Sequence, residues 1–259
     1  MGLKNRKVLL MLLVLSEFLL CGICFSQTEK EQVNVVFIDS GYAPFHITPA
    51  SPAKRIEKGI VVEILREFEK EYPYYKVSMK ELPKKRLIYQ MDKGEADMTY
   101  NSPLFTGKNS ENFIWSDPFI ESKDYVVMLK NNRFAFEKPE DLFGKTIGKI
   151  RGFGYGEYDS YFKEGKISGY DSEKTIYLIR MLKIGRLDGF LGNIHVTPYE
   201  MGLHNEKREN FYFPETPIYK FELGFQINKN RTKLKDDLNR FIKGAREDGL
   251  LKKIEAKYL

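Results

Sequence analysis

The chain has 259 residues and a formal net charge of +6, and 42% of its residues are hydrophobic. This length and composition predict a folded protein of one large or two modest domains, and they exclude a disordered tail. Basic residues are spread along the chain beside acidic ones, whereas a nucleic-acid-binding surface needs a concentrated basic stripe. We therefore expect no nucleic-acid partner.

Residues 1–26 have the features of a cleavable signal peptide. Lys4, Arg6 and Lys7 precede an apolar stretch that Glu17 interrupts, and the segment ends in a cleavage-like pattern of small residues. We predict export through this segment to the periplasm. The alternative is a retained membrane anchor, which the charge of Glu17 disfavours.

Both cysteines of the chain, Cys21 and Cys24, lie in this leader. Lipoprotein processing at either one is a further alternative, although Leu20 and Ile23 stand before them where a small residue is expected. If the leader is removed after Ser26, the exported protein has no thiol, no disulfide and no cysteine metal site.

A strand predicted over residues 33–38 leads into a loop, residues 39–45, that is rich in Gly and Pro and carries two aromatic residues. The carboxyl end of a strand is where open α/β sheets bind ligands. Tyr42 is expected to face a cleft and stack on a solute. For Phe45 two interpretations are open, stacking on the solute or filling the top of the core.

The next elements follow from periodicity. Apolar residues at helical spacing predict a helix over residues 60–72, alternation predicts a strand over residues 76–81, and Pro83 begins a second helix. That helix runs toward a Gly-x-x-Asp sequence, where glycine can adopt the left-handed backbone that ends a helix.

This Gly-x-x-Asp sequence occurs twice in the same context. Gly94 and Asp97 separate a helix from a strand, and Gly185 and Asp188 do so again about ninety residues later. Two copies of helix, Gly-x-x-Asp and strand predict two similar α/β lobes, each with its own sheet. A chain with two lobes has a cleft between them.

The second lobe offers a glycine-rich loop, residues 151–156, after a strand predicted over residues 145–150 and before a helix expected to begin near Tyr155. Backbone amides at a helix start bind anions, and Gly152 allows close approach of a ligand. Arg151 is the best candidate for a cation that faces the ligand. The alternative is that it is a surface arginine at the edge of the lobe. The spacing is not the dinucleotide fingerprint, so no cofactor is expected.

Several motifs then follow one another in a characteristic order. They are YAPF at 42–45, GIVVEILREFEKEY at 59–72, KGEADM at 93–98, WSDPF at 115–119, DLFGKTIG at 141–148, GRLDGFL at 185–191 and REDGLLKKIEAKYL at 246–259. This order resembles the extracytoplasmic solute-binding proteins of family 3, the periplasmic domains that deliver polar amino acids and related solutes to ABC importers. The resemblance extends over residues 33–259. It implies two Rossmann-like lobes joined by two crossing strands, the type II periplasmic binding fold, with a ligand between the lobes and a monomeric chain.

The resemblance also implies domain boundaries. Lobe 1 would comprise residues 27–122 and 222–259, and lobe 2 would be the insert of residues 123–221. The crossings would fall near residues 122–125 and 219–223, where the sequence has no flexible Gly/Ser linker.

The family's ligand anchors differ in this sequence. Family members that bind α-amino acids hold the carboxylate with an arginine six residues before the aromatic of the (F/W)SDP motif, and this position is Asn109 here, or Lys108 if the alignment slips by one residue. A lysine in such a loop is more often solvated than bound to a ligand. The acidic residue that pairs with the ammonium, five positions after Asp188, is Asn193. We expect that the protein does not bind a free α-amino acid in the family's usual way.

Tyr100 and Ser102, just past the second predicted strand of lobe 1, complete the expected ligand contacts, although Tyr100 could also be core packing. We expect a small polar solute to be captured when the lobes close over it, with lobe 1 aromatics and lobe 2 loop amides plus Arg151 each holding part of it. An ABC permease, or a sensor protein in the membrane, would then recognise the closed form.

A secreted enzyme of the same fold is the alternative, because a few relatives are dehydratases that use a cleft carboxylate. Asp39 would be that carboxylate, although a turn-capping role is the plainer interpretation. The histidines have no metal-ligand spacing, and no cysteine or serine has a nucleophile pattern. Of the histidines, His195 could reach the cleft. We expect no catalytic residue, no metal and no enzyme activity.

Overall fold

The computed structural model describes residues 29–39, 41–48, 56–105 and 110–258. The predicted signal peptide, with Cys21 and Cys24, lies outside these ranges, as do Lys108 and Asn109. Within the described ranges, every helix is too short or too polar to span a lipid bilayer.

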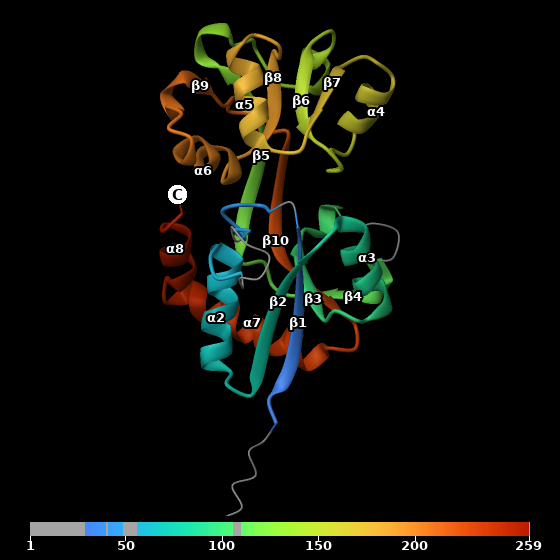
Figure 1. Ribbon diagram of the computed structural model, residues 1–259, viewed down its shortest axis with the longest axis vertical. Coiled ribbons are helices and arrows are strands. Elements are labelled where there is room, and N and C mark those ends of the chain that lie inside the picture. Colours follow the sequence, from blue (N-terminus) through green and yellow to red (C-terminus); the bar gives the residue numbers. More distant parts are fainter. Residues whose placement is uncertain (1–28, 40, 49–55, 106–109, 259) are drawn as a thin grey trace, which may run out of the picture.

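Two α/β lobes are joined by two long strands that pass between them, β5 (Ile120–Leu129) and β10 (Tyr219–Asn228) (Figure 1). One half of β10, Tyr219–Leu223, pairs antiparallel with β5, and the other half, Gly224–Ile227, pairs antiparallel with β3. The strand order is β2-β1-β3-β10-β5-β8-β6-β7. The predicted fold of two lobes with two crossing strands is therefore confirmed.

Lobe 1 is built around parallel strands, because β1 pairs in parallel with both β2 and β3. Its strands are β1 (Glu31–Ile38), β2 (Tyr75–Leu82), β3 (Met98–Asn101) and β4 (Phe113–Trp115). Its helices are α2 (Ile60–Glu71), α3 (Lys84–Lys93), α7 (Thr232–Glu247) and α8 (Leu250–Glu255), with short 3₁₀ turns at η1 (Pro103–Phe105) and η2 (Ser110–Asn112).

Lobe 2 repeats this plan, since β6 pairs in parallel with β7 and β8. Its strands are β6 (Thr146–Ile150), β7 (Ser168–Ser172), β8 (Gly189–Asn193) and β9 (Phe211–Tyr212). Its helices are α4 (Tyr158–Lys163), α5 (Thr175–Lys183) and α6 (Val196–Leu203), with 3₁₀ turns at η3 (Lys130–Asn132), η4 (Pro139–Leu142) and η5 (Arg208–Asn210).

The two Gly-x-x-Asp sequences make the same local structure in both lobes. Gly94 and Gly185 end helices α3 and α5 with φ of 69° and 72°, a region that suits glycine. The carboxylate of Asp97 then accepts the backbone N–H of Asn34 at 2.7 Å, and Asp188 accepts that of Thr146 at 2.7 Å. In each lobe the motif thus fastens the strand after the helix to the first strand of the sheet.

One sequence-based boundary is wrong. Helix α4 begins at Tyr158 and not near Tyr155. Gly156 has a φ of 54°, which no right-handed helix contains, and the carboxylate of Asp159 accepts the backbone N–H of Tyr155 at 2.9 Å. Residues 152–157 are therefore a loop, and this loop faces lobe 1.

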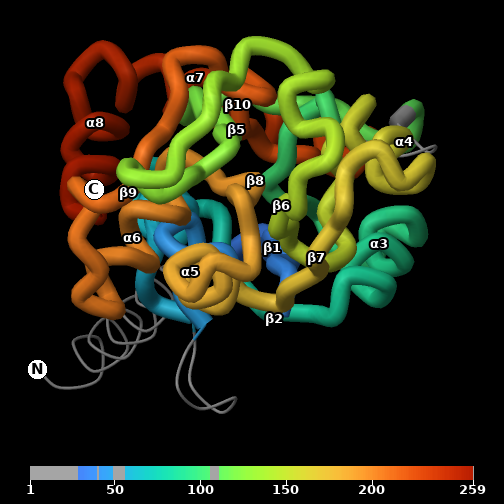
Figure 2. Tube along the Cα trace, turned by 90° about the horizontal axis from the view of Figure 1, so that it is seen from above, coloured from blue at the N-terminus to red at the C-terminus, as the bar shows by residue number. Residues whose placement is uncertain are grey.

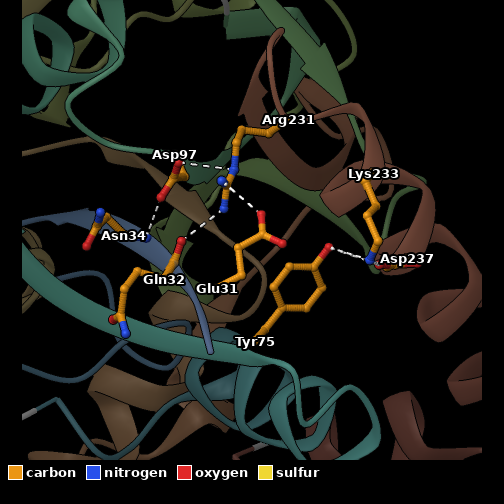
Figure 3. Close-up of polar contacts among 8 residues, drawn as sticks. All are labelled: Glu31, Gln32, Asn34, Tyr75, Asp97, Arg231, Lys233 and Asp237. Carbon is orange, nitrogen blue, oxygen red and sulfur yellow. Dashed lines mark hydrogen bonds and ion pairs between the residues drawn. The ribbon is translucent and has the colours of Figure 1, made fainter. Parts of the chain in front are cut away.

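Charged groups hold the base of lobe 1 together (Figure 3). Arg231 donates to the carbonyl of Gln32 at 2.9 Å and forms ion pairs with Glu31 at 3.0 Å and with Asp97 at 3.2 Å. These contacts join the start of α7 to β1 and to the Gly-x-x-Asp turn.

A second cluster forms around Asp237, which is fully buried on α7. Its carboxylate accepts from the hydroxyl of Tyr75 at 2.9 Å and pairs with Lys233 at 2.7 Å (Figure 3). It also accepts from the hydroxyl of Tyr74 at 2.8 Å and pairs with Arg240. Burial acts to raise the pKa of Asp237, but the hydrogen bonds from Lys233 and the tyrosines outweigh it and lower the pKa. This buried charge is compensated and is structural.

Four helices lie in pairs on two sides of the molecule. Helices α6 and α8, from different lobes, lie on one side of the molecule, and α3 and α4 lie on the other side (Figures 1 and 2). The sequence predicted a division of the chain into residues 27–122 with 222–259 and residues 123–221. Both boundaries of this division fall inside the paired strands β5 and β10. It stays a proposal.

Candidate functional site

A cavity of about 550 Å³ lies between the lobes. Lobe 1 lines it with residues after β1, on α3 and at the end of β3, and lobe 2 lines it with Phe153, Gly154, Tyr155 and Gly156. The crossing strands add Asp124 from β5 and side chains from β10. A solute in this space would touch both lobes.

Aromatic rings form much of the cavity wall. Six of them come from four separate parts of the chain: Tyr42, Tyr100, Phe153, Tyr155, Tyr219 and Phe221. Tyr42 and Phe153 meet across the cleft with their ring centroids 5.5 Å apart. The hydroxyl of Tyr219 donates to the carbonyl of Tyr155 at 2.6 Å, so the wall is also tied by hydrogen bonds.

Asp124 supplies a carboxylate to this aromatic wall. It lies on β5 directly opposite Tyr219 of β10. Its Oδ1 accepts from the side-chain amide of Asn193 at 2.8 Å. Burial raises the pKa of Asp124 to about 6, although the Asn193 amide and the nearby His195 act to lower it.

Asn193, a predicted ligand contact, does not line the cavity but is buried behind Asp124. Its side-chain nitrogen donates to Asp124 and to the hydroxyl of Ser122 at 2.8 Å, and its oxygen accepts the backbone N–H of His195 at 3.0 Å. The side-chain amide of Asn193 therefore orients Asp124, and both the nitrogen and the oxygen of this amide already have hydrogen-bond partners.

His195 is buried and links the two lobes. Its Nδ1 lies 3.2 Å from the hydroxyl of Ser122, and its Nε2 lies 3.1 Å from Glu255 on α8 of lobe 1. The ring also makes an edge contact with Phe45, with 5.5 Å between centroids. These contacts on both sides of the ring give His195 a structural role between the lobes.

Tyr100, by contrast, lines the cavity and is held from behind by His46. His46 is fully buried, and burial lowers its pKa to about 4, although the hydrogen bond to the carbonyl of Ile38 acts to raise it. A neutral ring that donates from Nε2 to Ile38 at 2.9 Å leaves Nδ1 to accept the hydroxyl of Tyr100 at 2.7 Å. The Tyr100 ring is thereby fixed in the wall.

We expect Tyr100→Phe to lower the free energy of unfolding by about 1–3 kcal/mol, because the buried Nδ1 of His46 would lose its donor. Urea denaturation measures the change. Tyr125→Phe is the matched control, because Tyr125 is also half-buried and its hydroxyl has no recorded bond within the described ranges. Equal small changes in both variants would contradict the role assigned to the Tyr100 hydroxyl.

Tyr42 and Phe45 occupy different layers. Tyr42 lines the cavity, whereas Phe45 is fully buried beneath it, with the two rings stacked at 5.4 Å between centroids. Phe45 packs with the apolar core of lobe 1 and does not line the cavity. Of the two interpretations open from the sequence, the structure places Phe45 in the core.

The other predicted contacts are dispersed. Ser102 is buried outside the cavity lining, where its hydroxyl accepts the backbone N–H of Leu104 at 3.3 Å. Arg151 is largely exposed, lies outside the lining, and pairs with the exposed Glu173 at 3.2 Å. The carbonyl of Gly152 accepts the ammonium of Lys84, a contact between α3 of lobe 1 and the lobe 2 loop.

The remaining sequence candidates are two residues of the loop before the WSDPF motif and one acidic residue after β1. Lys108 and Asn109 lie outside the described residues, and Asp39, considered as a catalytic carboxylate, is exposed and outside the cavity lining. Within the described ranges, no group of three histidine, cysteine, aspartate or glutamate side chains is arranged to hold a metal ion.

Sequence reasoning missed Asp124, Lys84 and Phe153. The segment around Asp124 was predicted to cross between the lobes, and residues on crossing strands lie where the cleft is deepest. Strand alternation places Ser122 and Asp124 on one face. A charged residue on this face of a crossing strand was the feature of the sequence that could have identified Asp124 as a site residue.

The chain matches the family described as bacterial extracellular solute-binding proteins, family 3, over residues 35–259. The L-cystine-binding protein TcyJ of Bacillus subtilis (strain 168) is 23% identical over 261 residues, which cover 96% of this chain and 94% of that protein.

Solved structures share the fold. An ancestral arginine-binding protein bound to arginine matches with a TM-score of 0.68 and 18% identity, covering 89% of this chain and 99% of that one. A histidine kinase sensor domain with similarity to periplasmic binding proteins matches with a TM-score of 0.71 and 17% identity, covering 89% and 97%.

Proposed function

This chain belongs to the bacterial extracellular solute-binding proteins of family 3, and we propose that it captures a small solute in the cavity between its lobes and delivers it to an ABC permease. The observation that carries the proposal is the cavity itself, whose walls come from both lobes and whose one crossing-strand carboxylate, Asp124, faces into it. Binding without turnover is the activity expected of such a site.

Lobe closure is the mechanism that this geometry supports. A solute that touches Tyr42 and Tyr100 on lobe 1 and Tyr155 on lobe 2 binds the closed form better than the open one, so it shifts the population toward closure. Lys84 with Gly152, and Tyr42 with Phe153, already join the lobes across the cleft in this conformation. A permease can then distinguish the closed, loaded form.

The relatives are named for amino acids, but the residues around this cavity argue for a different solute. Asn193, at the position of the family's acidic anchor, has its amide committed to Asp124, Ser122 and the backbone of His195. Within the described ranges no arginine lines the cavity to hold an α-carboxylate. We therefore keep the proposal that a free α-amino acid is not the principal ligand.

The location proposed for this function is the extracytoplasmic space, in keeping with the family. Export through residues 1–26, processing after Ser26 and a monomeric state remain part of the proposal. Mass spectrometry of the exported protein gives the processing site directly, and an unprocessed or lipid-modified chain would contradict it.

A thermal-shift screen of the purified protein tests the proposed function. We expect one solute class among amino acids, dipeptides, polyamines, organic acids and sugars to raise the melting temperature, since a ligand at a hundred times its Kd adds about 2.7 kcal/mol of stability. The matched control is the same panel with Tyr42→Ala, which removes one wall of the cavity. No shift with any class, in a protein that is folded, would contradict solute capture.

A further inference from the structure

The carboxylate of Asp124 is the starting point. Its Oδ1 accepts one hydrogen bond from the neutral amide of Asn193. Within the described ranges no hydrogen bond to Oδ2 and no ion pair with Asp124 is recorded. Hydrogen bonds and partners of opposite charge both offset the desolvation of a half-buried carboxylate. Among the described residues Asp124 has one hydrogen bond from a neutral amide and no ion pair, so a cationic group of a ligand would add the compensation that an ion pair gives.

The surroundings of Asp124 are aromatic. Tyr42, Tyr155 and Tyr219 come close enough that its negative charge contributes to raising their pKa values, after burial, which is the larger cause. The hydroxyls of two of them are used elsewhere: that of Tyr219 donates to a backbone carbonyl, and that of Tyr155 accepts from the backbone of Ile150 at 3.0 Å. All three tyrosines line the same cavity as Asp124, so their rings form part of the wall around the carboxylate.

Aromatic faces and a carboxylate attract the same kind of group. The face of a tyrosine or phenylalanine ring is electronegative and binds a cation within about 6 Å of its centre. A carboxylate binds an ammonium or guanidinium through a charge-assisted hydrogen bond. Both elements of this wall thus select a positive charge.

The cavity offers little to an anion. Among its described lining residues, the cationic side chain is Lys84, whose ammonium donates to the carbonyl of Gly152, while the acidic ones are Asp92 and Asp124. Arg151 is outside the lining and pairs with Glu173. A ligand carboxylate would therefore meet more negative than positive charge.

We propose that the solute is an organic amine without an α-carboxylate, with its ammonium or guanidinium group bound to Asp124 beneath the rings of Tyr42, Tyr155 and Tyr219. This inference rests on the proposed function and specifies its substrate class. Asn193 then acts as a positioning residue that holds Asp124 from behind, in place of an acidic residue that contacts the ligand itself.

Matched sets of solutes test the charge requirement. Tyramine, tyrosine and 3-(4-hydroxyphenyl)propanoate share one ring and chain but carry an amine, both charges or an acid. Agmatine with arginine, and cadaverine with lysine, extend the comparison to guanidinium and aliphatic chains. Isothermal titration at pH 7.5 should detect at least one amine binding at least tenfold more tightly than its carboxylate-bearing partner.

The variant Asp124→Asn tests the anchor. It keeps the shape of the side chain, and we expect it to weaken amine binding by 30-fold or more because the charge-assisted bond is lost. Glu121→Gln is the matched control, since Glu121 is an exposed acid on the same strand and its removal changes the net charge equally. Its affinity should stay within twofold of the wild type. The wild-type pH profile described in the Discussion is an independent second measurement should Asp124→Asn fold poorly.

The outcomes separate the two proposals. Tighter binding of a zwitterion or an acid, or equal affinities in Asp124→Asn and Glu121→Gln, overturns the amine inference while leaving solute capture in place. Failure of every amine in the sets also overturns it, and if another class in the thermal-shift screen then binds, the proposed function stands. If nothing in the screen binds, both are overturned.

Discussion

Replacing Phe45 with alanine is expected to lower the free energy of unfolding by about 3–5 kcal/mol, the usual cost of deleting a fully buried aromatic ring. The ring has no exposed surface and packs against Tyr42, Tyr100 and His195, with centroid distances of 5.4, 6.1 and 5.5 Å. Since His195 belongs to lobe 2, the cavity left by this substitution would also loosen a contact between the lobes.

Tyr42→Ala provides the comparison, because Tyr42 lies directly above Phe45 but is only half-buried and lines the cavity. We expect it to cost about 1–2 kcal/mol of stability, since less apolar surface returns to water, and to weaken solute binding more than it weakens the fold. Urea denaturation gives both stability changes. If Tyr42→Ala were the more destabilising of the two, the assignment of Phe45 to the core and Tyr42 to the site would be wrong.

Solute binding by the wild type is expected to weaken as the pH falls below 6. An amine requires the ionised form of Asp124, whose pKa burial raises to about 6 in the free protein. The affinity for an amine that stays protonated throughout should therefore be about tenfold lower at pH 5 than at pH 7.5. The titratable groups facing Asp124 are Tyr42, Tyr155, Tyr219 and His195.

The free energy of unfolding of the ligand-free protein should also change with pH as Asp124 ionises. The pKa of Asp124 is higher in the folded chain than its ordinary value of 3.8, so between these values the folded state binds more protons than the unfolded state. The contribution of this group to the free energy of unfolding therefore falls as the pH rises from about 4 to about 6, by about 3 kcal/mol in total.

Calorimetric titrations from pH 5 to pH 8, and urea denaturation from pH 4 to pH 7, measure the two effects. Asp124→Asn is the control in both measurements. Neither its affinity for the amine nor its free energy of unfolding should show the change with pH that the ionisation of Asp124 causes. A wild-type affinity that is flat across this range, or that rises toward low pH, would show that an ionised Asp124 is not the anchor.

Local chemistry made much of the fold predictable. Gly94 and Gly185 end helices because glycine adopts the left-handed backbone, and Asp97 and Asp188 bind the neighbouring strand within the same supersecondary unit. These interactions depend on residues close in sequence or in an adjacent strand. The repeat of two lobes could therefore be recognised without coordinates.

The site was less predictable, because its residues meet only after the lobes are assembled. Sequence position alone made Arg151 a candidate cation, but in the structure its side chain lies outside the cavity lining and pairs with the exposed Glu173. The same reasoning made Asn193 a ligand contact, but its amide is directed to Asp124, which lies 69 residues away in the chain. No local pattern specifies such a pairing.

The sequence by itself determined the class of fold, the repeated Gly-x-x-Asp turns and the loop that carries Tyr42 into the cleft, because periodicity and turn chemistry act over a few residues. Only the tertiary structure decided that Phe45 belongs to the core and that Asp124 faces the cavity. Burial and electrostatic environment are set by every segment packed around a side chain, and the antiparallel pairing of β5 with β10 is what sets Asp124 opposite Tyr219 among aromatic rings from both lobes.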